Sequence, residues 1–297
     1  MVEILQDFEP FFGHSKTTIP ATGAFPYLSK LGVIDIGSNS VRMVIFDGAA
    51  RSPAYFFNEK ILCGLGSGLA HSGKLHAKGK LRAISAIERF VNLADAMEVP
   101  QLSLIATAAV RSASDGLLFC DEIKRKTGKE INIIDGTEEA RLSAQGVMLG
   151  WPGAYGLVCD LGGSSMELAE INQGSVGKCL TSELGPLILK ELKGGKKNRK
   201  QHIKETMAKL ATEMGPQHNR LFLVGGSWRA FARIDMLRRG YPLHVMHEYR
   251  ISLSSVKKTI KFIETSELEE IRKKCGITAA RIKLLPIACE ILSRLVG

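Results

Sequence analysis

The sequence predicts an α/β fold made of two similar lobes, and three observations support this prediction. Strand and helix patterns alternate along the chain from residue 31 onward. A unit of apolar strand, aspartate, glycine-containing turn and returning strand occurs twice, with Asp160 lying 125 residues after Asp35. The 297 residues, 45% of them hydrophobic, suffice for two cores, although length alone also allows one large domain. We therefore expect a duplicated half-domain with two lobes facing each other across a cleft.

The predicted division is an extension at 1–30, a first lobe at 31–143 and a second lobe at 144–297. The extension has no sustained period and contains Pro10, Pro20 and Pro26, so we expect it to be loosely ordered. In the first lobe we expect strands at 31–36, 41–46, 54–62, 102–106 and 131–134. Helices are expected at 78–97, 116–127 and 137–147, the last with Thr137 as its N-cap, and residues 64–73 are expected to form a glycine-rich loop.

The second lobe repeats this order, with predicted strands at 156–160, 166–172 and 221–224 and with helices after residue 227 and at 286–295. Between them, residues 190–204 carry a run of basic residues, namely Lys193, Lys196, Lys197, Arg199 and Lys200. Such a run usually forms a solvated loop leading into a helix, and the alternative is a patch that guides a polyanion. Nucleic-acid binding is not expected, because only 6% of the residues are aromatic and none interrupts this run.

Composition limits the partners and the compartment. The formal net charge of +10 favours anionic partners, because a positive surface attracts phosphate groups. Six scattered cysteines without a Cys-x-x-Cys pair predict reduced thiols, with neither a disulfide framework nor a zinc site. No stretch approaches the roughly 18–20 apolar residues that cross a bilayer, and the N-terminus lacks a signal-peptide pattern. We expect a soluble cytoplasmic protein without membrane contact, and a homodimer is compatible with the sequence.

Three glycine-containing turns are candidates for phosphate binding, because a sharply bent backbone points several N–H groups in one direction. Two of them follow the strand-terminal aspartates, and the third precedes a helix, whose N-terminus favours anions. A single turn of this kind is also common in β-hairpins for geometric reasons, whereas two copies after an aspartate favour phosphate. The residues are Gly37, Ser38, Asn39 and Ser40; Gly162, Gly163, Ser164 and Ser165; and Gly225, Gly226 and Ser227, with Thr107 in the matching place of the first lobe.

Acidic residues at the strand ends are candidates for metal binding. Asp35 and Asp160 end apolar strands, where a carboxylate needs a cation or hydrogen-bond donors, although a single aspartate there can also cap its own turn. Glu167 lies seven residues after Asp160 on the returning strand, so a hairpin brings it back toward the turn. Mg²⁺ prefers such oxygen ligands and keeps several waters. Asp160 and Glu167, with Asp35, are therefore the candidate Mg²⁺ ligands.

Two further residue types suit phosphoryl chemistry. Glu138 and Glu139 open a predicted helix, where the helix dipole alone accounts for one of them. Hydrolysis of a phosphate bond needs a carboxylate that can orient or deprotonate water. Arg111 and Arg42 are candidates for bidentate phosphate binding, and Arg111 has a surface helix position as its alternative.

Five motifs in a fixed order resemble the exopolyphosphatase / guanosine pentaphosphate phosphatase family. They are IDIGSNSVR at 34–42, TAAVR at 107–111, GTEEAR at 136–141, DLGGSSME at 160–167 and VGGS at 224–227. The similarity runs from about residue 31 to the C-terminus. It implies two ribonuclease-H-like lobes of the acetate-and-sugar-kinase/Hsp70/actin superfamily, an active site in the interdomain cleft, Mg²⁺ dependence and release of orthophosphate from a chain end.

The resemblance also implies roles for individual residues. Glu139, the second of the paired glutamates, matches the proposed catalytic base of the family, and Arg111 matches a phosphate-binding arginine. Asp160 and Glu167 match the acidic residues on the metal side, and the glycine-rich turns match phosphate-binding loops.

Two departures from the family pattern stand out. Ser164 occupies the place of a third glycine, and a φ above zero there would strain a serine by about 1–2 kcal/mol. Relatives continue beyond a helix matching residues 286–295 into a further strand and glycine-rich turn, whereas this sequence ends at Gly297, so we interpret it as a short two-domain form.

The function expected from the sequence is exopolyphosphatase activity, in which terminal orthophosphate is hydrolysed from inorganic polyphosphate. Guanosine pentaphosphate is the alternative substrate within the same reaction class. Two alternatives of other classes stay open: a non-hydrolytic protein that binds polyphosphate or an alarmone, and a kinase or ATPase of the same superfamily.

Overall fold

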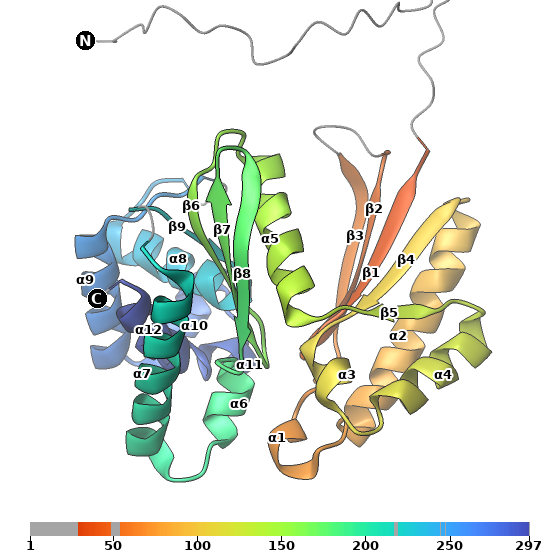
Figure 1. Cartoon of the computed structure of the whole chain (residues 1–297), viewed down its shortest axis with the longest axis horizontal. Helices are drawn as coiled ribbons and strands as arrows, with labels where there is room; N and C mark the ends of the chain where they lie inside the picture. The colour runs from red at the N-terminus through yellow and green to blue at the C-terminus, as the bar shows by residue number, and fades with distance from the viewer. Residues whose placement is uncertain (1–28, 49–53, 217–218, 244, 247, 297) are drawn as a thin grey trace, which may run out of the picture.

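Two mixed β-sheets organise the computed structural model, which describes residues 29–48, 54–216, 219–243, 245–246 and 248–296 (Figure 1). The predicted extension at 1–30 lies, apart from its last two residues, outside the described residues. The predicted α/β class is confirmed, because each sheet carries helices from the segments that alternate with its strands. The boundary between residues 143 and 144 stays a prediction.

The first sheet contains five strands in the order β3-β2-β1-β4-β5. They are β1 (Leu31–Ile36), β2 (Ser40–Phe46), β3 (Tyr55–Leu62), β4 (Gln101–Ala106) and β5 (Ile131–Ile133). β1, β2 and β3 form an antiparallel meander, and β4 and β5 run parallel to β1. Along β1 the side chains of Ile34 and Ile36 enter the core while Asp35 points to the other face, as the two-residue period of a strand requires.

The second sheet repeats this plan in the order β8-β7-β6-β9. Its strands are β6 (Gly156–Leu161), β7 (Met166–Asn172), β8 (Ser175–Ser182) and β9 (Leu221–Val224). β6 pairs antiparallel with β7 and parallel with β9, as β1 does with β2 and β4. The prediction did not include β8, which takes the place of β3 in the second lobe.

Helices cover both sheets. The first lobe carries α1 (Leu69–Ser72), α2 (Ala77–Ala96), α3 (Ala108–Ser112) and α4 (Gly116–Thr127). α5 (Gly136–Gly150) follows, and then come α6 (Pro186–Glu191), α7 (Gly195–Met214), α8 (Gly226–Arg239), α9 (Leu253–Thr265), α10 (Leu268–Cys275), α11 (Ala279–Ile282) and α12 (Leu285–Leu295). None of these described helices has the length and apolar character that a bilayer crossing requires. Residues 64–73, predicted as a loop, include the single-turn helix α1.

The core is divided between the lobes. Large buried side chains of the first lobe, such as Phe90 and Phe119, pack between its sheet and the helices α2 and α4. In the second lobe Phe231 and its neighbours fill the space between the sheet and the C-terminal helices. α5 packs its small residues Ala140 and Ala144 on the opposite face of that second sheet. α5 therefore lies between the two sheets in Figure 1.

One predicted cap is wrong. The N-cap of α5 is Asp135, whose Oδ1 accepts the backbone N–H of Glu138 at 2.8 Å, whereas Thr137 lies inside the first turn. The Thr137 hydroxyl instead donates to the same carboxylate at 2.6 Å. Aspartate and threonine are both favoured at N-caps, and Asp135 has the extended backbone conformation that this position requires.

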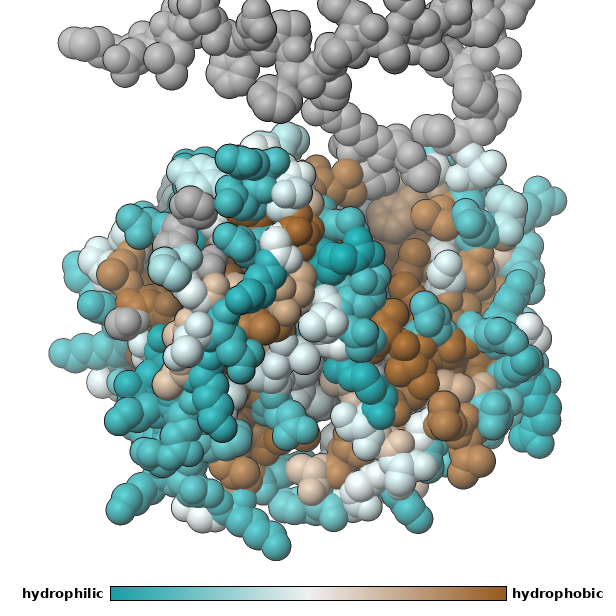
Figure 2. All heavy atoms as spheres, in the orientation of Figure 1, coloured by the Kyte–Doolittle hydropathy of each residue, from teal (hydrophilic) through white to brown (hydrophobic). Residues whose placement is uncertain are grey.

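The basic run at 190–204 lies mostly on α7 and faces solvent. Lys193, Lys196, Lys197 and Lys200 are exposed, and Figure 2 shows hydrophilic residues gathered over this part of the molecule. Arg199 turns inward instead, and its guanidinium donates two hydrogen bonds of 2.9 Å to the Glu290 carboxylate. The run is solvated as predicted, but residues 195–204 lie on α7 itself and not in a loop that leads into it.

Candidate active site

The two aspartate-turn units are geometrically equivalent. The N–H of Gly37 donates to the Ser40 carbonyl at 3.0 Å, and the N–H of Gly162 donates to the Ser165 carbonyl at 3.0 Å. Both bonds close the same hairpin turn, 125 residues apart. The internal duplication expected from the sequence is therefore present in the backbone of both lobes.

The two hairpin tips meet. A Cβ atom built on Gly163 would lie 3.1 Å from the Cβ of Ser38, and one built on Gly66 would lie 3.2 Å from the Ser164 hydroxyl. The N–H of Gly66 in turn donates to the Ser38 carbonyl at 2.7 Å. The candidate phosphate-binding turns of the two lobes thus lie against each other, and glycine at 163 permits this approach because it has no side chain.

Ser164 does not carry the strain that a positive φ would impose. The described non-glycine residues with positive φ are Glu98, Gln173 and Glu248, and Ser164 is not among them. Its hydroxyl is buried without a hydrogen-bond partner. Serine in the place of the third glycine therefore leaves the backbone of this turn relaxed.

The two strand-terminal aspartates lie close enough to influence each other. The Asp35 side chain reaches solvent, and that of Asp160 is half-buried and accepts a short hydrogen bond from the Ser143 hydroxyl of α5. Removal from bulk water raises the pKa of Asp35, Lys60 lowers it and Asp160 raises it again. Burial likewise raises the pKa of Asp160, while Ser143 and Arg229 lower it.

Glu139 reaches this acidic group from the first turn of α5. Its side chain is 17% exposed, and its Oε2 atom lies 3.5 Å from Nη1 of Arg111. That same Nη1 donates to the Ile134 carbonyl at 2.6 Å, so Arg111 links α3 to the segment before α5. Burial raises the pKa of Glu139 to about 7, Arg111 lowers it, and Asp160 and Asp35 raise it.

Glu167 completes the acidic group from β7. It is the cross-strand partner of Asp160, and its side chain is buried. Its Oε1 accepts a hydrogen bond of 3.1 Å from the Thr181 hydroxyl of β8, and its Oε2 has no hydrogen-bond partner. Burial raises the pKa of Glu167 to about 8, and the charge of Glu139 raises it further.

The donor set fits a hard cation that is bound by few protein ligands. The buried Oε2 atoms of Glu139 and Glu167 both lack hydrogen-bond partners. The charge of Asp160 raises the pKa of both glutamates, and that of Glu139 raises the pKa of Glu167. Among the described residues, no group of three or more acidic, histidine or cysteine side chains is placed so that it could hold a metal ion by itself. Mg²⁺ is commonly held by one or two carboxylates together with waters and substrate phosphates, so the residues present suit it.

The third turn lies beside the second aspartate. Gly225 has a φ of 113°, and a Cβ atom there would lie 3.2 Å from Oδ1 of Asp160. Gly226 begins α8 directly after it. Ser227 and Thr107 make no side-chain hydrogen bond to any described residue, and Thr107 joins the site through its backbone N–H, which donates to the Ile36 carbonyl at 3.3 Å.

Arg42 lies opposite Asp35 in the β1–β2 pairing, and its Nε donates to the Asn58 amide oxygen at 2.9 Å. Two neighbours of the carboxylates, Ser143 and Thr181, were not anticipated from the sequence. Ser143 follows Glu139 by four residues on α5, which is the spacing of one helical face and the signal that could have identified it. Thr181 lies on β8, the strand that the sequence pattern did not reveal.

Comparison with known proteins identifies relatives of this chain. A profile of the Ppx/GppA phosphatase family matches residues 44–296. Exopolyphosphatase 1 of Mycobacterium tuberculosis is 31% identical over 143 residues, which cover 47% of this chain and 42% of that relative. The protein of the same name from Mycobacterium leprae is 28% identical over the same length. The chain therefore covers less than half of the curated relatives that it matches.

Solved structures share the fold. A crystal structure of an exopolyphosphatase from Cytophaga hutchinsonii aligns with a TM-score of 0.79 at 23% identity, covering 90% of both chains. The Ppx/GppA family member of Aquifex aeolicus aligns with a TM-score of 0.72 at 22% identity, covering 90% of this chain and 89% of that chain. The two-sheet α/β fold of this chain is therefore shared with both solved structures. Since the profile covers most of the sequence, the chain belongs to the Ppx/GppA phosphatase family.

Proposed function

We propose that this protein is an exopolyphosphatase, which hydrolyses the terminal phosphoanhydride bond of inorganic polyphosphate and releases orthophosphate. One observation supports this proposal above all. A buried glutamate with a raised pKa, Glu139, lies beside carboxylates of both lobes. Asp35 and Asp160 stand next to glycine-rich turns that meet between those lobes.

Glu139 is the proposed general base. A carboxylate whose pKa is near 7 can take a proton from water at neutral pH, which an ordinary glutamate does poorly. The oxygen of that water attacks the terminal phosphorus, the bond to the bridging oxygen breaks, and the shortened chain keeps the negative charge. Arg111 is held by the Ile134 carbonyl, so it can fix the position of Glu139 and face a phosphoryl oxygen with its other N–H groups.

The remaining residues hold the terminal phosphoryl group. We propose that backbone N–H groups of the turns at 37–40, 162–165 and 225–227 bind its oxygens, together with Arg42. Asp160 and Glu167, with Asp35, would hold Mg²⁺, which neutralises charge on the phosphoryl oxygens when bound. All six cysteines are free, and this fits the proposed cytoplasmic location.

The test is a phosphate-release assay on inorganic polyphosphate, with and without Mg²⁺. We expect release with Mg²⁺ and loss of release in excess EDTA. Guanosine pentaphosphate is assayed in parallel, and a higher kcat/KM for it than for polyphosphate would replace the proposed substrate. Absence of release from either compound with Mg²⁺ present would contradict the proposal.

That last result, combined with tight polyphosphate binding in a titration, would identify a non-hydrolytic binding protein. Strain at Ser164 was one of two departures from the family pattern that favoured this alternative in the sequence. The φ of Ser164 is not positive, which removes the strain argument, and the buried Glu139 beside Asp160 is the reason that we favour hydrolysis.

A further inference from the structure

The duplicated strands carry different charges at equivalent positions. In the second lobe the cross-strand row is Asp160, Glu167 and Thr181. In the first lobe the corresponding row is Asp35, Arg42 and Lys60, because Arg42 pairs with both Asp35 and Lys60. Directly paired side chains of neighbouring strands point to the same face of a sheet. The first lobe therefore presents two cations where the second lobe presents a carboxylate and a hydroxyl.

The second lobe adds two arginines near this row. Arg281 of α11 lies with its guanidinium against Gly226, since a Cβ atom built on that glycine would lie 2.1 Å from its Nη1. Gly226 is the first residue of α8, and Arg229 follows it by three residues. Gly225, directly before this helix, contacts Asp160, so both arginines belong to the neighbourhood of the candidate active site. Lys60 and Arg229 reach solvent, and Arg281 is half-buried.

Among the described residues, no carboxylate forms an ion pair with any of these three cations. No ion pair within the described ranges includes Lys60, Arg229 or Arg281, whereas other arginines of the second lobe, such as Arg199 and Arg272, are paired. Removal from water lowers the pKa of Lys60, and the charges of Arg281 and Arg229 lower it further. The pKa of Arg229 and of Arg281 is lowered by the same two causes, burial and neighbouring arginines. Asp35 partly offsets this lowering for Lys60, and Asp160 does so for Arg229. A group of like charges from both lobes is thus held close together, and within the described residues no carboxylate is within ion-pair distance of it.

We propose that Lys60, Arg229 and Arg281 form a second anion subsite, which binds the phosphoryl groups that follow the terminal one in a polyphosphate chain. The inference rests on the proposed function and concerns the leaving part of the substrate. Since each cation would meet a charged oxygen, a chain long enough to reach all three binds more tightly than a short one. The subsite therefore determines chain-length preference.

The experiment compares kcat/KM for long-chain polyphosphate with kcat/KM for tripolyphosphate. We expect Lys60→Gln, Arg229→Gln and Arg281→Gln each to lower this ratio about tenfold or more, the loss expected for one charge-assisted hydrogen bond. Arg272→Gln is the matched control, because it removes one positive charge from an arginine that is ion-paired with Glu269 at the surface. We expect its ratio to equal that of the wild type.

Direct binding separates this inference from the proposed function. Isothermal titration with long-chain polyphosphate and with tripolyphosphate, in the absence of Mg²⁺, reports the subsite even if the wild type releases no phosphate. A shallower dependence of Kd on salt in the three variants supports a direct contact, because fewer ions are released on binding. If the wild type is active and all three variants keep its ratio of kcat/KM values, the subsite is contradicted while the proposed function is not. An equal loss in Arg272→Gln overturns it as well, since net charge would then explain the effect.

A folding defect would not obscure the result. Arg281 packs on the start of α8, so its substitution is checked by circular dichroism and by thermal denaturation. Lys60 lies on an edge strand with an exposed side chain, and Lys60→Gln gives the decisive measurement if Arg281→Gln unfolds.

Discussion

Two consecutive glutamates at the start of α5 have opposite surroundings. Glu138 faces solvent, and both of its oxygens accept hydrogen bonds from Arg141, which lowers its pKa. Glu139 is mostly buried, its Oε2 has no hydrogen-bond partner, and its pKa is raised. The helix dipole acts on both, so burial and neighbouring carboxylates decide the difference.

Replacement of Glu139 tests its role as general base. We expect Glu139→Gln to lower kcat by about 10²–10⁴ while the Kd for polyphosphate stays within about threefold, because glutamine keeps the shape and loses the base. Glu138→Gln is the control one residue away, and its kcat should stay within about twofold of the wild type, since its carboxylate faces solvent. Equal losses of kcat in the two variants would show that the start of α5 matters for the structure and that Glu139 does not act as a base.

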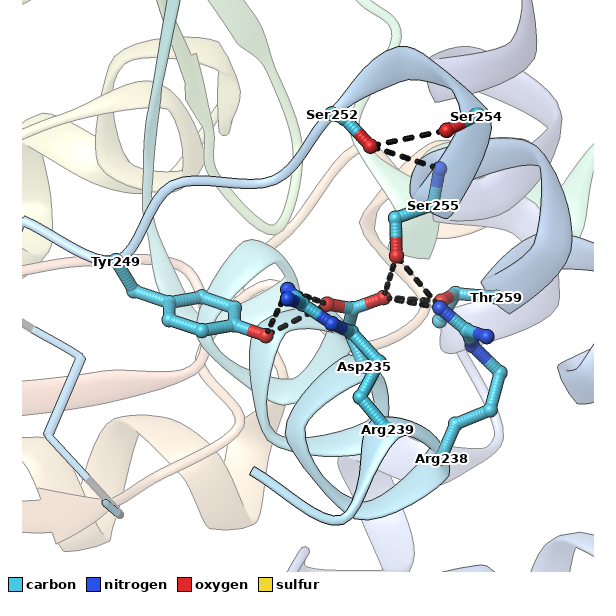
Figure 3. A network of polar contacts seen from close by, with 8 residues as sticks. All are labelled: Asp235, Arg238, Arg239, Tyr249, Ser252, Ser254, Ser255 and Thr259. Carbon is cyan, nitrogen blue, oxygen red and sulfur yellow. Dashed lines mark hydrogen bonds and ion pairs between the residues drawn. The ribbon is translucent and has the colours of Figure 1, made fainter. Parts of the chain in front are cut away.

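The pKa of a second buried carboxylate, that of Asp235, is lowered and not raised. Asp235 of α8 is fully buried, and five donors surround it in Figure 3. The Tyr249 hydroxyl donates at 2.6 Å, Thr259 at 2.6 Å and Ser255 at 2.7 Å, with Arg238 and Arg239 adding positive charge. Desolvation raises the pKa of Asp235, but the hydrogen bonds from Thr259, Tyr249, Ser255 and Arg238 outweigh it and lower the pKa to about 2.

Asp235→Asn should destabilise the fold and change its dependence on pH. We expect a loss of about 3 kcal/mol at pH 7, because a buried ion pair loses its anion. The wild-type carboxylate has a lower pKa in the folded protein than in the unfolded chain, so its contribution is complete above about pH 5 and is lost as the pH falls toward 2. We therefore expect the gap in free energy of unfolding between wild type and variant, measured by urea denaturation, to be about 1 kcal/mol smaller at pH 3 than at pH 6. A gap that is constant with pH would rule out this carboxylate as the cause.

At the level of secondary-structure elements, the two hairpin tips are the feature on which the site depends. The tip between β6 and β7 lies between the Ser38 tip and Leu187 of α6, whose N–H donates to the Gly163 carbonyl at 2.9 Å. A Cβ atom at position 163 would lie 3.0 Å from the Leu187 side chain and 3.1 Å from Ser38. Both contacts are tight, so a methyl group there moves one tip away from the other.

Gly163→Ala is expected to lower kcat/KM about tenfold and to change the free energy of unfolding by less than about 1 kcal/mol. A displacement of a few tenths of an ångström affects the alignment of phosphate ligands more than it affects a hairpin at the edge of the core. Gly146→Ala is the control, because Gly146 is an exposed residue of α5 with open space around it. This control should leave kcat/KM unchanged and stabilise the protein by about 0.5–1 kcal/mol. Full activity in Gly163→Ala would show that the tips need not touch.

Most elements near the site could be predicted because their signals are local. The strand-aspartate-glycine pattern gave both hairpins, and α4 was predicted at its observed bounds, 116–127. β8 was missed because its residues, from Ser175 to Ser182, are mixed in character and mostly not buried, so they lack a clear period of two. Lys60, Arg229 and Arg281 were missed for another reason. They come from three distant segments, and only the tertiary structure brings their charges together.

At the scale of the whole molecule, the two lobes have separate apolar cores, and polar and glycine-rich contacts lie where the hairpin tips meet. The Gly68 N–H of the first lobe donates to the Glu191 carboxylate of the second at 2.9 Å, and the hairpin tips meet nearby. Asp35 and Asp160 come from the two lobes, and the negative charge of Asp160 raises the pKa of Asp35, against a lowering by Lys60. Without a bound cation, desolvation of the two carboxylates and their mutual repulsion therefore work against the approach of the lobes, since the pKa of each is raised on balance.

The variant Asp160→Asn distinguishes the destabilisation caused by the Asp160 carboxylate in the metal-free protein from the stabilisation that a bound cation provides. In EDTA we expect the variant to melt about 2–4 °C above the wild type, since the repulsion with Asp35 disappears and asparagine can still accept the Ser143 hydrogen bond. Mg²⁺ at 100 times its Kd should stabilise the folded wild type by about 2.7 kcal/mol and thereby raise its Tm. The same Mg²⁺ concentration should raise the Tm of the variant much less. Asp121→Asn, at an exposed position of α4, is the control and should shift with Mg²⁺ as the wild type does. A Tm in EDTA below that of the wild type would mean that the Asp160 carboxylate stabilises the metal-free protein. A Tm increase with Mg²⁺ as large as that of the wild type would mean that Asp160 does not bind the ion.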